Sequence, residues 1–515
     1  MEGLRRDYRT VRLLITNPPT RDHGLKQPSE AIIQYDKERK DCLNTLRFRN
    51  SRFEKISSHD EHTFEWFEKC REYRDWNDSE RSSLFLVEGK PGSGKSTLTR
   101  YFTNLPKDGA IVAKFFYSHR DGELERNHRI MVQCLLYDIL NTEESFFIHF
   151  QQAYRDLGGP PEPHCPPRTW TYETLKKILR ACAKHPVKRK LLLIVDAMDE
   201  SDDEDRADIV QFLWDLSVPT DSGCVVKVFL ACRPINDTPA VTHGSYRIRL
   251  QEKNKEDIVR YTCAFLRKPV FGSIQGFSSQ IEEYIIKHAD GAFLWVRLLE
   301  DELVRFLKKG APPARALEFL RSLPLELERY YERILQNLDG GDPDDIRYGQ
   351  RIFQFCLFSH RAIEIMELAH ALAISGEIGD PPPDTSTWEM QIPADIERLV
   401  NNCARCLVEI RNTQASHRDG LAIVQVMHQT VRQFFFRPHG AVGRSPNYRD
   451  VADEQRARAM IETTCVNYLK LHHAELVRDF HSPAEAWSDE DFGKFVRYLN
   501  ERPFIKYSLE YLSHH

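Results

Sequence analysis

Apolar and polar positions follow two patterns along this chain, and the pattern changes near residue 250. Between residues 84 and 250, short apolar runs alternate with segments in which apolar residues recur every three or four positions. Runs of the first kind predict buried strands, and segments of the second kind predict helices. Their alternation indicates a parallel sheet with helices on both faces, an α/β fold. We expect strands at 84–87, 111–117, 191–195 and 225–231, and helices at 130–140, 172–183 and 207–216.

The remainder of the chain is mostly helical in pattern. The segments 406–410 and 421–427 are exceptions, because they have the pattern of a strand pair, and an apolar helix start follows at 431–436. Helices combined with a short hairpin suggest a winged-helix module. Helical apolar spacing is found at 31–74, 257–266, 281–288, 293–307, 363–374 and 453–515.

The composition is that of an ordinary globular protein with several domains. The chain has 515 residues, of which 41% are hydrophobic and 29% charged, so three or four domains are expected. A formal net charge of −5 argues against nucleic acid as a general partner. No apolar run approaches the roughly 18 residues of a membrane span. The 12 scattered cysteines, including the lone pair Cys403 and Cys406, suggest reduced structural thiols in a cytoplasmic protein.

The most specific motif is Gly89–Ser96, which fills every fixed position of the P-loop pattern G-x-x-x-x-G-K-[ST]. A predicted strand precedes it and a helix-like segment follows it, as the motif requires. Glycines let successive backbone N–H groups curl around a phosphate chain, and the helix N-terminus adds partial positive charge. Lys95 can reach the β- and γ-phosphates, and the Ser96 hydroxyl can bind Mg²⁺. The residues expected to bind nucleotide here are Gly89, Pro91, Gly92, Ser93, Gly94, Lys95, Ser96 and Thr97.

A second motif begins where the apolar segment 191–195 ends in Asp196. Ligands of open parallel sheets bind at the carboxyl ends of the strands. Asp196 is therefore expected to hold Mg²⁺ together with Ser96. Asp199 and Glu200 follow closely, and either could orient or deprotonate an attacking water. The alternative is a core strand that ends in a solvated acidic turn.

Two further residues have both a functional and a structural interpretation. Arg233 follows the predicted strand 225–231, where a cation can sense a γ-phosphate. Its alternative is an ion pair with the acidic run at 199–205. His428 lies between a predicted strand and an apolar helix start, and those neighbours alone favour a structural role.

In combination, these motifs resemble the NACHT-type STAND NTPases, in particular the fungal NOD-like-receptor branch and nephrocystin-like N-terminal NTPase modules. They occur in that family's order from about residue 40 to residue 515, and only the P-loop is specific by itself. The matching segments are Val87–Leu98, Lys114–Tyr117, Ile194–Glu200, Leu230–Pro234, Ala289–Val296 and Met427–Val431.

The resemblance implies a switch controlled by ATP and ADP. ADP would hold the NTPase, helical and winged-helix parts closed, and ATP would open the chain and permit self-association. Arg233 matches the family's sensor arginine, although Ala231 and Cys232 replace the usual hydroxyl residues. His428 matches a winged-helix histidine that contacts the β-phosphate of ADP. Signalling in non-self recognition or programmed cell death is a family-level association, and the protein partners are unknown.

The resemblance also implies an order of domains. Residues 1–50 form a lead-in that is too short for the family's N-terminal effector domain, and the NTPase domain occupies 51–248. A helical domain at 249–338, a winged-helix-like domain at 339–440 and a C-terminal helical segment at 441–515 follow. The sensor repeats that usually follow in the family are not expected.

Slow ATP hydrolysis is the expected activity, and two other functions remain open. The first is a conventional ATP-driven motor, and the second is a scaffold with a weak nucleotide site. The presence of Lys95, Ser96, Asp196 and Glu200 argues against the scaffold. Fast stimulated turnover would indicate a motor, very slow turnover a switch, and no nucleotide binding a scaffold.

Overall fold

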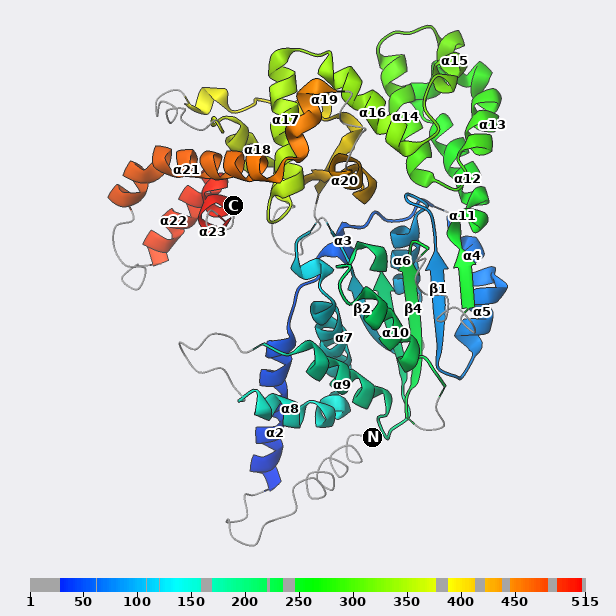
Figure 1. Cartoon of the computed structure of the whole chain (residues 1–515), viewed down its shortest axis with the longest axis vertical. Helices are drawn as coiled ribbons and strands as arrows, with labels where there is room; N and C mark the ends of the chain where they lie inside the picture. Colours follow the sequence, from blue (N-terminus) through cyan, green and yellow to red (C-terminus); the bar gives the residue numbers. More distant parts are fainter. Residues whose placement is uncertain are drawn as a thin grey trace.

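The computed structural model describes residues 28–61, 63–107, 109–119, 121–158, 169–219, 223–234, 246–376, 388–412, 422–437, 445–479 and 489–511. The first 27 residues of the expected lead-in lie outside these ranges. A sheet with its covering helices forms one end of the molecule, and a mostly helical part forms the other (Figure 1). Among the described helices, none has the length and apolar character needed to cross a membrane.

The sheet is parallel and has the strand order β2-β3-β4-β1-β5. The four predicted strands are confirmed within two residues at each end. The fifth, β5, was not expected, because four residues at a sheet edge give too little pattern to recognise. The strands are β1 (Ser83–Glu88), β2 (Ile111–Phe116), β3 (Lys190–Asp196), β4 (Val225–Cys232) and β5 (Tyr246–Arg249).

Side chains alternate between two cores, one on each face of this sheet. In β1, Leu84 and Leu86 belong to one core, and Phe85 and Val87 belong to the other. Because both faces are covered by helices, the strands are apolar throughout. The three predicted helices are confirmed on the first face. The helices of that face are α2 (Pro28–Leu46), α7 (His128–Thr142), α8 (Gln151–Asp156), α9 (Tyr172–Ala183) and α10 (Arg206–Leu216).

The second face is covered by α4 (Glu65–Lys69), α5 (Arg71–Asp78) and α6 (Lys95–Asn104). The expectation of continuous helix over 31–74 was wrong at 47–51 and 56–61, where the chain is not helical. One reason is tertiary: the Phe64 amide donates to the Asp257 carboxylate (3.3 Å), and Phe64 itself has φ 65°. A local pattern cannot reveal a partner that is so far away in the sequence.

Beyond the sheet lie two further units. The helical unit comprises α11 (Leu250–Lys253), α12 (Lys255–Leu266), α13 (Ser278–His288), α14 (Phe293–Lys308), α15 (Ala316–Arg321) and α16 (Leu327–Asp339). The mixed unit comprises α17 (Pro343–Phe358), β6 (Ile363–Glu364), α18 (Ile365–Leu372), α19 (Ile396–Cys403), β7 (Val408–Asn412), β8 (Ala422–Val426) and α20 (Gln429–Phe436). The chain continues with α21 (Glu454–Asp479), α22 (Asp489–Glu501) and α23 (Phe504–Tyr511).

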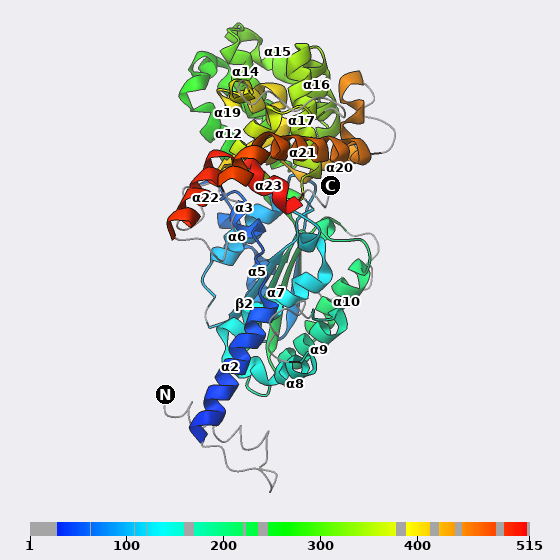
Figure 2. The same cartoon turned by 90° about the vertical axis from the view of Figure 1, so that its left-hand side faces the viewer.

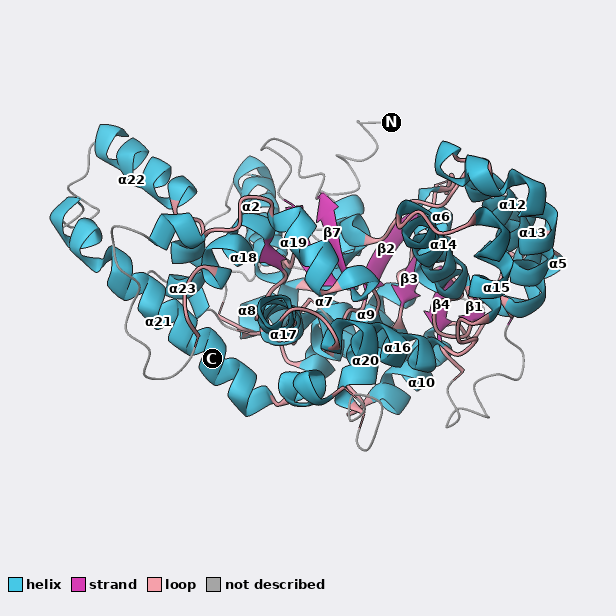
Figure 3. Cartoon of the chain, turned by 90° about the horizontal axis from the view of Figure 1, so that it is seen from above, coloured by secondary structure: helices cyan, strands magenta, loops and turns pink. Residues whose placement is uncertain are grey.

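The predicted strand pair is confirmed as β7 and β8, which pair antiparallel. The strand order of this small sheet is β6-β8-β7, and β6 has only two residues. Both units lie on the side of the large sheet from which the P-loop emerges (Figure 2). Seen from that side, α14, α16 and α20 lie above the ends of β1, β3 and β4 (Figure 3).

A buried histidine in the mixed unit predicts a pH-dependent stability. His370 is 6% exposed, contacts the Tyr468 hydroxyl at 2.7 Å and packs against Trp388. Burial lowers the pKa of His370 to about 4, and the charges of His472 and Arg502 add to this effect. The folded state thus holds a neutral ring, whereas the unfolded chain takes up a proton below pH 6.5. Stability should therefore be lost as pH falls from 6.5 towards 4, by about 2 kcal/mol at pH 5 from this residue.

The measurement is urea unfolding at pH 7 and pH 5 for the native chain and for His370→Gln. The variant is expected to lose less stability on acidification, because it has no ring to protonate. An identical loss in both proteins would contradict the assignment to His370.

Candidate functional site

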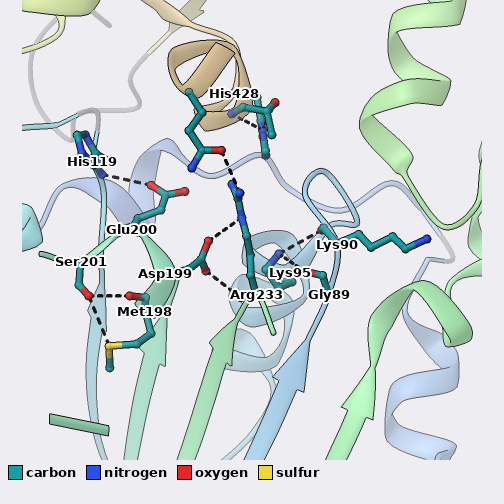
Figure 4. A network of polar contacts seen from close by, with 12 residues as sticks. Gly89, Lys90, Lys95, His119, Met198, Asp199, Glu200, Ser201, Arg233 and His428 are labelled. Atoms are coloured by element: carbon teal, nitrogen blue, oxygen red, sulfur yellow. Dashed lines mark hydrogen bonds and ion pairs between the residues drawn. The ribbon is translucent and has the colours of Figure 1, made fainter. Parts of the chain in front are cut away.

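The P-loop Gly89–Ser96 joins β1 to α6 and is folded so that its backbone surrounds an open space. Gly92 and Gly94 have φ of 72° and 97°, a conformation that L side chains rarely adopt. The Lys95 ammonium donates to the carbonyls of Gly89 (2.8 Å) and Lys90 (3.2 Å), as Figure 4 shows. Burial lowers the pKa of Lys95, while Asp199 opposes that shift. The Lys95 ammonium is thus held within the loop by two backbone carbonyls. A phosphate bound in the loop can replace these carbonyls as the partner of the ammonium.

Asp196 ends β3 and lies directly behind the start of α6. Its Oδ1 accepts from the Thr99 hydroxyl at 2.8 Å, whereas its Oδ2 has no hydrogen-bond partner among the described residues. Burial raises the pKa of Asp196 to about 6, and the hydroxyls of Ser96 and Thr99 oppose the shift. A buried carboxylate oxygen without a partner, next to a hydroxyl, suits a hard cation with oxygen ligands. Ser96 and Asp196 are therefore the residues that could hold Mg²⁺.

Asp199 and Arg233 lie together at the ends of β3 and β4. The Arg233 Nε atom pairs with Asp199 Oδ2 at 2.8 Å, and the Arg233 amide donates to Asp199 Oδ1 at 3.0 Å. The ion pair that the acidic run suggested is thus present. It does not remove Arg233 from the site, because Arg233 also lines the central cavity. Arg233 Nη1 donates in addition to Gln433 on α20 (3.0 Å), so it connects the sheet to the mixed unit (Figure 4).

Glu200 has surroundings different from those of Asp199. Its Oε2 accepts from the His119 amide at 3.2 Å, just beyond the end of β2 (Figure 4). The His119 ring faces Arg126, and burial, with Arg432 and Arg126, lowers the pKa of His119 to about 4. Glu200 is thus held at the end of β2, whereas Asp199 is held by Arg233 at the end of β4.

His428 is the N-cap of α20. Its Nδ1 accepts from the Thr430 amide (3.2 Å) and lies 2.9 Å from the Thr430 hydroxyl. That hydroxyl in turn contacts the Tyr331 hydroxyl of α16 at 2.7 Å. Because Nδ1 is an acceptor, the neutral ring carries its proton on Nε2. His428 thus has the structural role, since it caps a helix, and it also lines the same cavity as the P-loop.

One cavity of about 570 Å³ brings these residues together. This volume is in the range of small-molecule sites. Gly89 and Asp196 are the predicted residues that do not line it; Asp196 is fully buried just behind it. The predicted residues that do line it are Pro91, Gly92, Ser93, Gly94, Lys95, Ser96, Thr97, Asp199, Glu200, Arg233 and His428.

The chain is similar in sequence to known proteins over part of its length. Residues 62–233 match the model of the family described as nephrocystin 3, N-terminal. A segment of 380 residues is 22% identical to the vegetative incompatibility protein HET-E-1 of Podospora anserina. It covers 72% of this chain and 25% of that protein, so the chain spans about a quarter of the relative's length. These sequence matches support a NACHT-type STAND NTPase.

Two solved structures are similar at a lower level. One is a signal transduction ATPase with numerous domains (STAND) and a tetratricopeptide repeat sensor from Pyrococcus horikoshii. It has 12% identity and a TM-score of 0.36, covering 89% of this chain and 64% of that one. The other is Cdc6p from Pyrobaculum aerophilum, with 11% identity and a TM-score of 0.32 over 79% and 99% of the chains.

The helical unit contributes residues to this site that single-motif reasoning missed. The buried side chain of Asn254 donates to the carbonyls of Ser93 (3.0 Å) and Gly291 (2.9 Å), and the Leu294 amide donates to Gly92 O (3.0 Å). A Cβ on Gly92 would lie 2.6 Å from that of Leu294. The motif Ala289–Val296 was the available signal, because Gly291 and Leu294 belong to it. It fastens the helical unit to the P-loop.

Proposed function

We propose that this chain is a nucleotide-controlled switch that binds ATP and ADP with Mg²⁺ and hydrolyses ATP slowly. The observation that carries the proposal is the single cavity, which is lined by the P-loop, by Leu294 of the helical unit and by His428 of the mixed unit. A ligand in this cavity contacts three units at once. The number of its phosphates can therefore change how these units are held together.

In the proposed reaction, Lys95 and the P-loop amides hold the phosphate chain, and Arg233 senses its terminal phosphate. Mg²⁺ held by Ser96 and Asp196 would neutralise charge on the phosphates. Glu200 orients the attacking water and accepts its proton at a carboxylate oxygen. Asp199 positions Arg233, with which it is paired at 2.8 Å.

The domain assignment is part of the same proposal. The three-stranded sheet β6-β8-β7 with α17–α20 supports a winged-helix-like domain within 339–440. The helical domain corresponds to 249–338 and the C-terminal helices to 441–515. We place α2 in the P-loop domain, because Cys42 and Leu46 are fully buried in its core.

We further propose that the ATP-bound chain self-associates and that the switch serves signalling. The support is the similarity to HET-E-1, whose name describes it as a vegetative incompatibility protein. A role of this chain in non-self recognition or programmed cell death is the corresponding hypothesis.

The direct test identifies the nucleotide carried by the purified protein after denaturation, by ion-exchange chromatography. We expect stoichiometric ADP. A chain that neither carries nor binds ATP or ADP at millimolar concentration would overturn the proposal, and rapid turnover would favour a motor.

Removing the His428 ring is expected to weaken the binding of ADP about tenfold and the binding of ATP less than threefold. The reason is that a charge-assisted hydrogen bond from the ring to the β-phosphate would form only in the closed, ADP-bound state. The measurement is isothermal titration of His428→Ala with each nucleotide. His288→Ala is the matched control, since the His288 ring contacts the Tyr284 carbonyl (2.7 Å) and does not line the cavity. Equal losses of ADP and ATP would exclude His428 from the switch.

A further inference from the structure

Arg52 is a buried arginine in the wall of the same cavity, and no motif pointed to it. It begins the short helix α3 (Arg52–Lys55) and is only 6% exposed. Its Nε and Nη1 atoms are buried and have no hydrogen-bond partner among the described residues. A guanidinium remains charged at any physiological pH. Burying guanidinium nitrogens without hydrogen bonds is unfavourable, so an anionic ligand in the cavity would supply the acceptors for Nε and Nη1.

Two buried acids act on Arg52 electrostatically, and each has one carboxylate oxygen bonded to another residue. Asp121 pairs with Lys55 at 2.6 Å, and Asp196 accepts from Thr99. Arg52 acts on both carboxylates through space: with Lys55 it lowers the pKa of Asp121, and it opposes the rise that burial causes in the pKa of Asp196. It donates a hydrogen bond to neither of them. Arg52 therefore differs from Lys55 and Arg233, whose charges are satisfied by a carboxylate in contact.

The segment that carries Arg52 is fixed against β2, mainly at the carboxyl end of that strand. Asn50 Nδ2 donates to the Phe116 carbonyl at 3.0 Å, and the rings of Phe53 and Phe116 lie 5.2 Å apart. The Lys114 ammonium lies 3.9 Å above the Phe53 ring. These contacts hold α3 beside β2 and near the start of α6 (Figure 1). The guanidinium is thus oriented before any ligand arrives, which reduces the entropy that binding costs.

We propose that Arg52 binds the terminal phosphate of a nucleoside triphosphate and so distinguishes it from a diphosphate. The proposal rests on the proposed nucleotide function of the cavity. The P-loop amides and Lys95 would hold the β-phosphate, and Lys95 also reaches the γ-phosphate. Arg52 lines the same cavity and its charge acts on Asp196, the expected Mg²⁺ ligand, so Arg52 lies on the side where the free end of the phosphate chain would lie. The guanidinium can donate two parallel hydrogen bonds to one phosphate group. A diphosphate ends before this position and leaves Arg52 without its partner.

The test compares the affinities of Arg52→Gln and the native chain for ADP and for a hydrolysis-resistant ATP analogue, each with Mg²⁺, by isothermal titration. The variant should bind the triphosphate roughly 10- to 100-fold more weakly, the effect of losing a hydrogen bond to a charged group. Its affinity for ADP should change less than threefold. Lys55→Gln is the matched control: it removes the other cation of α3, which is paired with Asp121 outside the cavity wall. It should lower the melting temperature without changing the preference for triphosphate.

Equal weakening of both nucleotides, or an unchanged preference, would overturn the proposal. If Arg52→Gln does not fold, Arg52→Lys retains the charge but loses the two-pronged donor, and it should still reduce the triphosphate preference at least threefold. An unchanged preference in Arg52→Lys would then overturn the proposal. Failure of the native chain to bind either nucleotide would overturn the function of the whole cavity, whereas normal binding with a silent Arg52→Gln would overturn only the role of Arg52.

Discussion

Lys95→Ala is expected to abolish nucleotide binding, with an affinity loss of at least 100-fold for both ATP and ADP. Lys95 lies inside the cavity, and among the described residues its ammonium has the carbonyls of Gly89 and Lys90 as hydrogen-bond partners. A bound β-phosphate would take the place of these carbonyls. Removing one partner of such a desolvated charge pair costs about 2–5 kcal/mol. The measurement is displacement of a fluorescent nucleotide analogue, with the melting temperature recorded as a check of folding.

Lys90→Ala provides the matched control, because Lys90 belongs to the same loop and pairs with Asp290 without lining the cavity. It should bind both nucleotides within about threefold of the native chain, as is usual for an exposed ion pair. Undiminished affinity in Lys95→Ala would refute the assignment of the P-loop.

The sheet and the P-loop could be predicted from sequence because their signals are local. Each strand from β1 to β4 is a run of residues buried on both faces, and such a run is apolar whatever surrounds it. The strands β5 and β6 were missed because four and two residues contain too little periodicity. The order β2-β3-β4-β1-β5 could not be predicted either, since it depends on which apolar faces meet.

The candidate site was predictable only where a residue belongs to a motif. Lys95, Asp196 and Arg233 each follow a strand, so their place at one sheet edge follows from the parallel arrangement. Asn254 and Arg52 follow no strand and match no pattern. Asn254 matters because it is buried against Ser93 of the P-loop, 161 residues away in the sequence. Arg52 matters because two of its buried nitrogens lack hydrogen-bond partners among the described residues. Both properties belong to the folded chain alone.

Arg233 has a central place in the proposed switch. It pairs with Asp199 on the sheet and donates to Gln433 on α20, and it lines the cavity between them. A γ-phosphate that attracts this guanidinium competes with Gln433 for it. Binding of a triphosphate would thus weaken a contact that joins the mixed unit to the sheet, whereas a diphosphate leaves it intact. ATP and ADP would therefore favour different arrangements of the mixed unit relative to the sheet, as a switch requires.

The two acids that follow β3 should have different phenotypes when they are changed. The affinity of Glu200→Gln for ATP is expected to lie within about threefold of that of the native chain. Its rate of ATP hydrolysis is expected to be at least about 10²-fold lower. The amide keeps the shape of the carboxylate, including its acceptor for the His119 amide, but cannot take a proton from water. The measurement is single-turnover release of phosphate from bound ATP, with binding determined separately.

Asp199→Asn is the informative comparison, because Asp199 pairs with Arg233 and is proposed to position that arginine, not the attacking water. The amide can still accept from the Arg233 amide but no longer neutralises the guanidinium. We expect hydrolysis to slow less than in Glu200→Gln, and the preference between ATP and ADP to change, since a less restrained Arg233 meets the γ-phosphate. If Asp199→Asn loses as much turnover as Glu200→Gln while nucleotide preference stays constant, the roles assigned to the two acids would have to be exchanged. If both variants hydrolyse ATP at the native rate, neither residue orients the water.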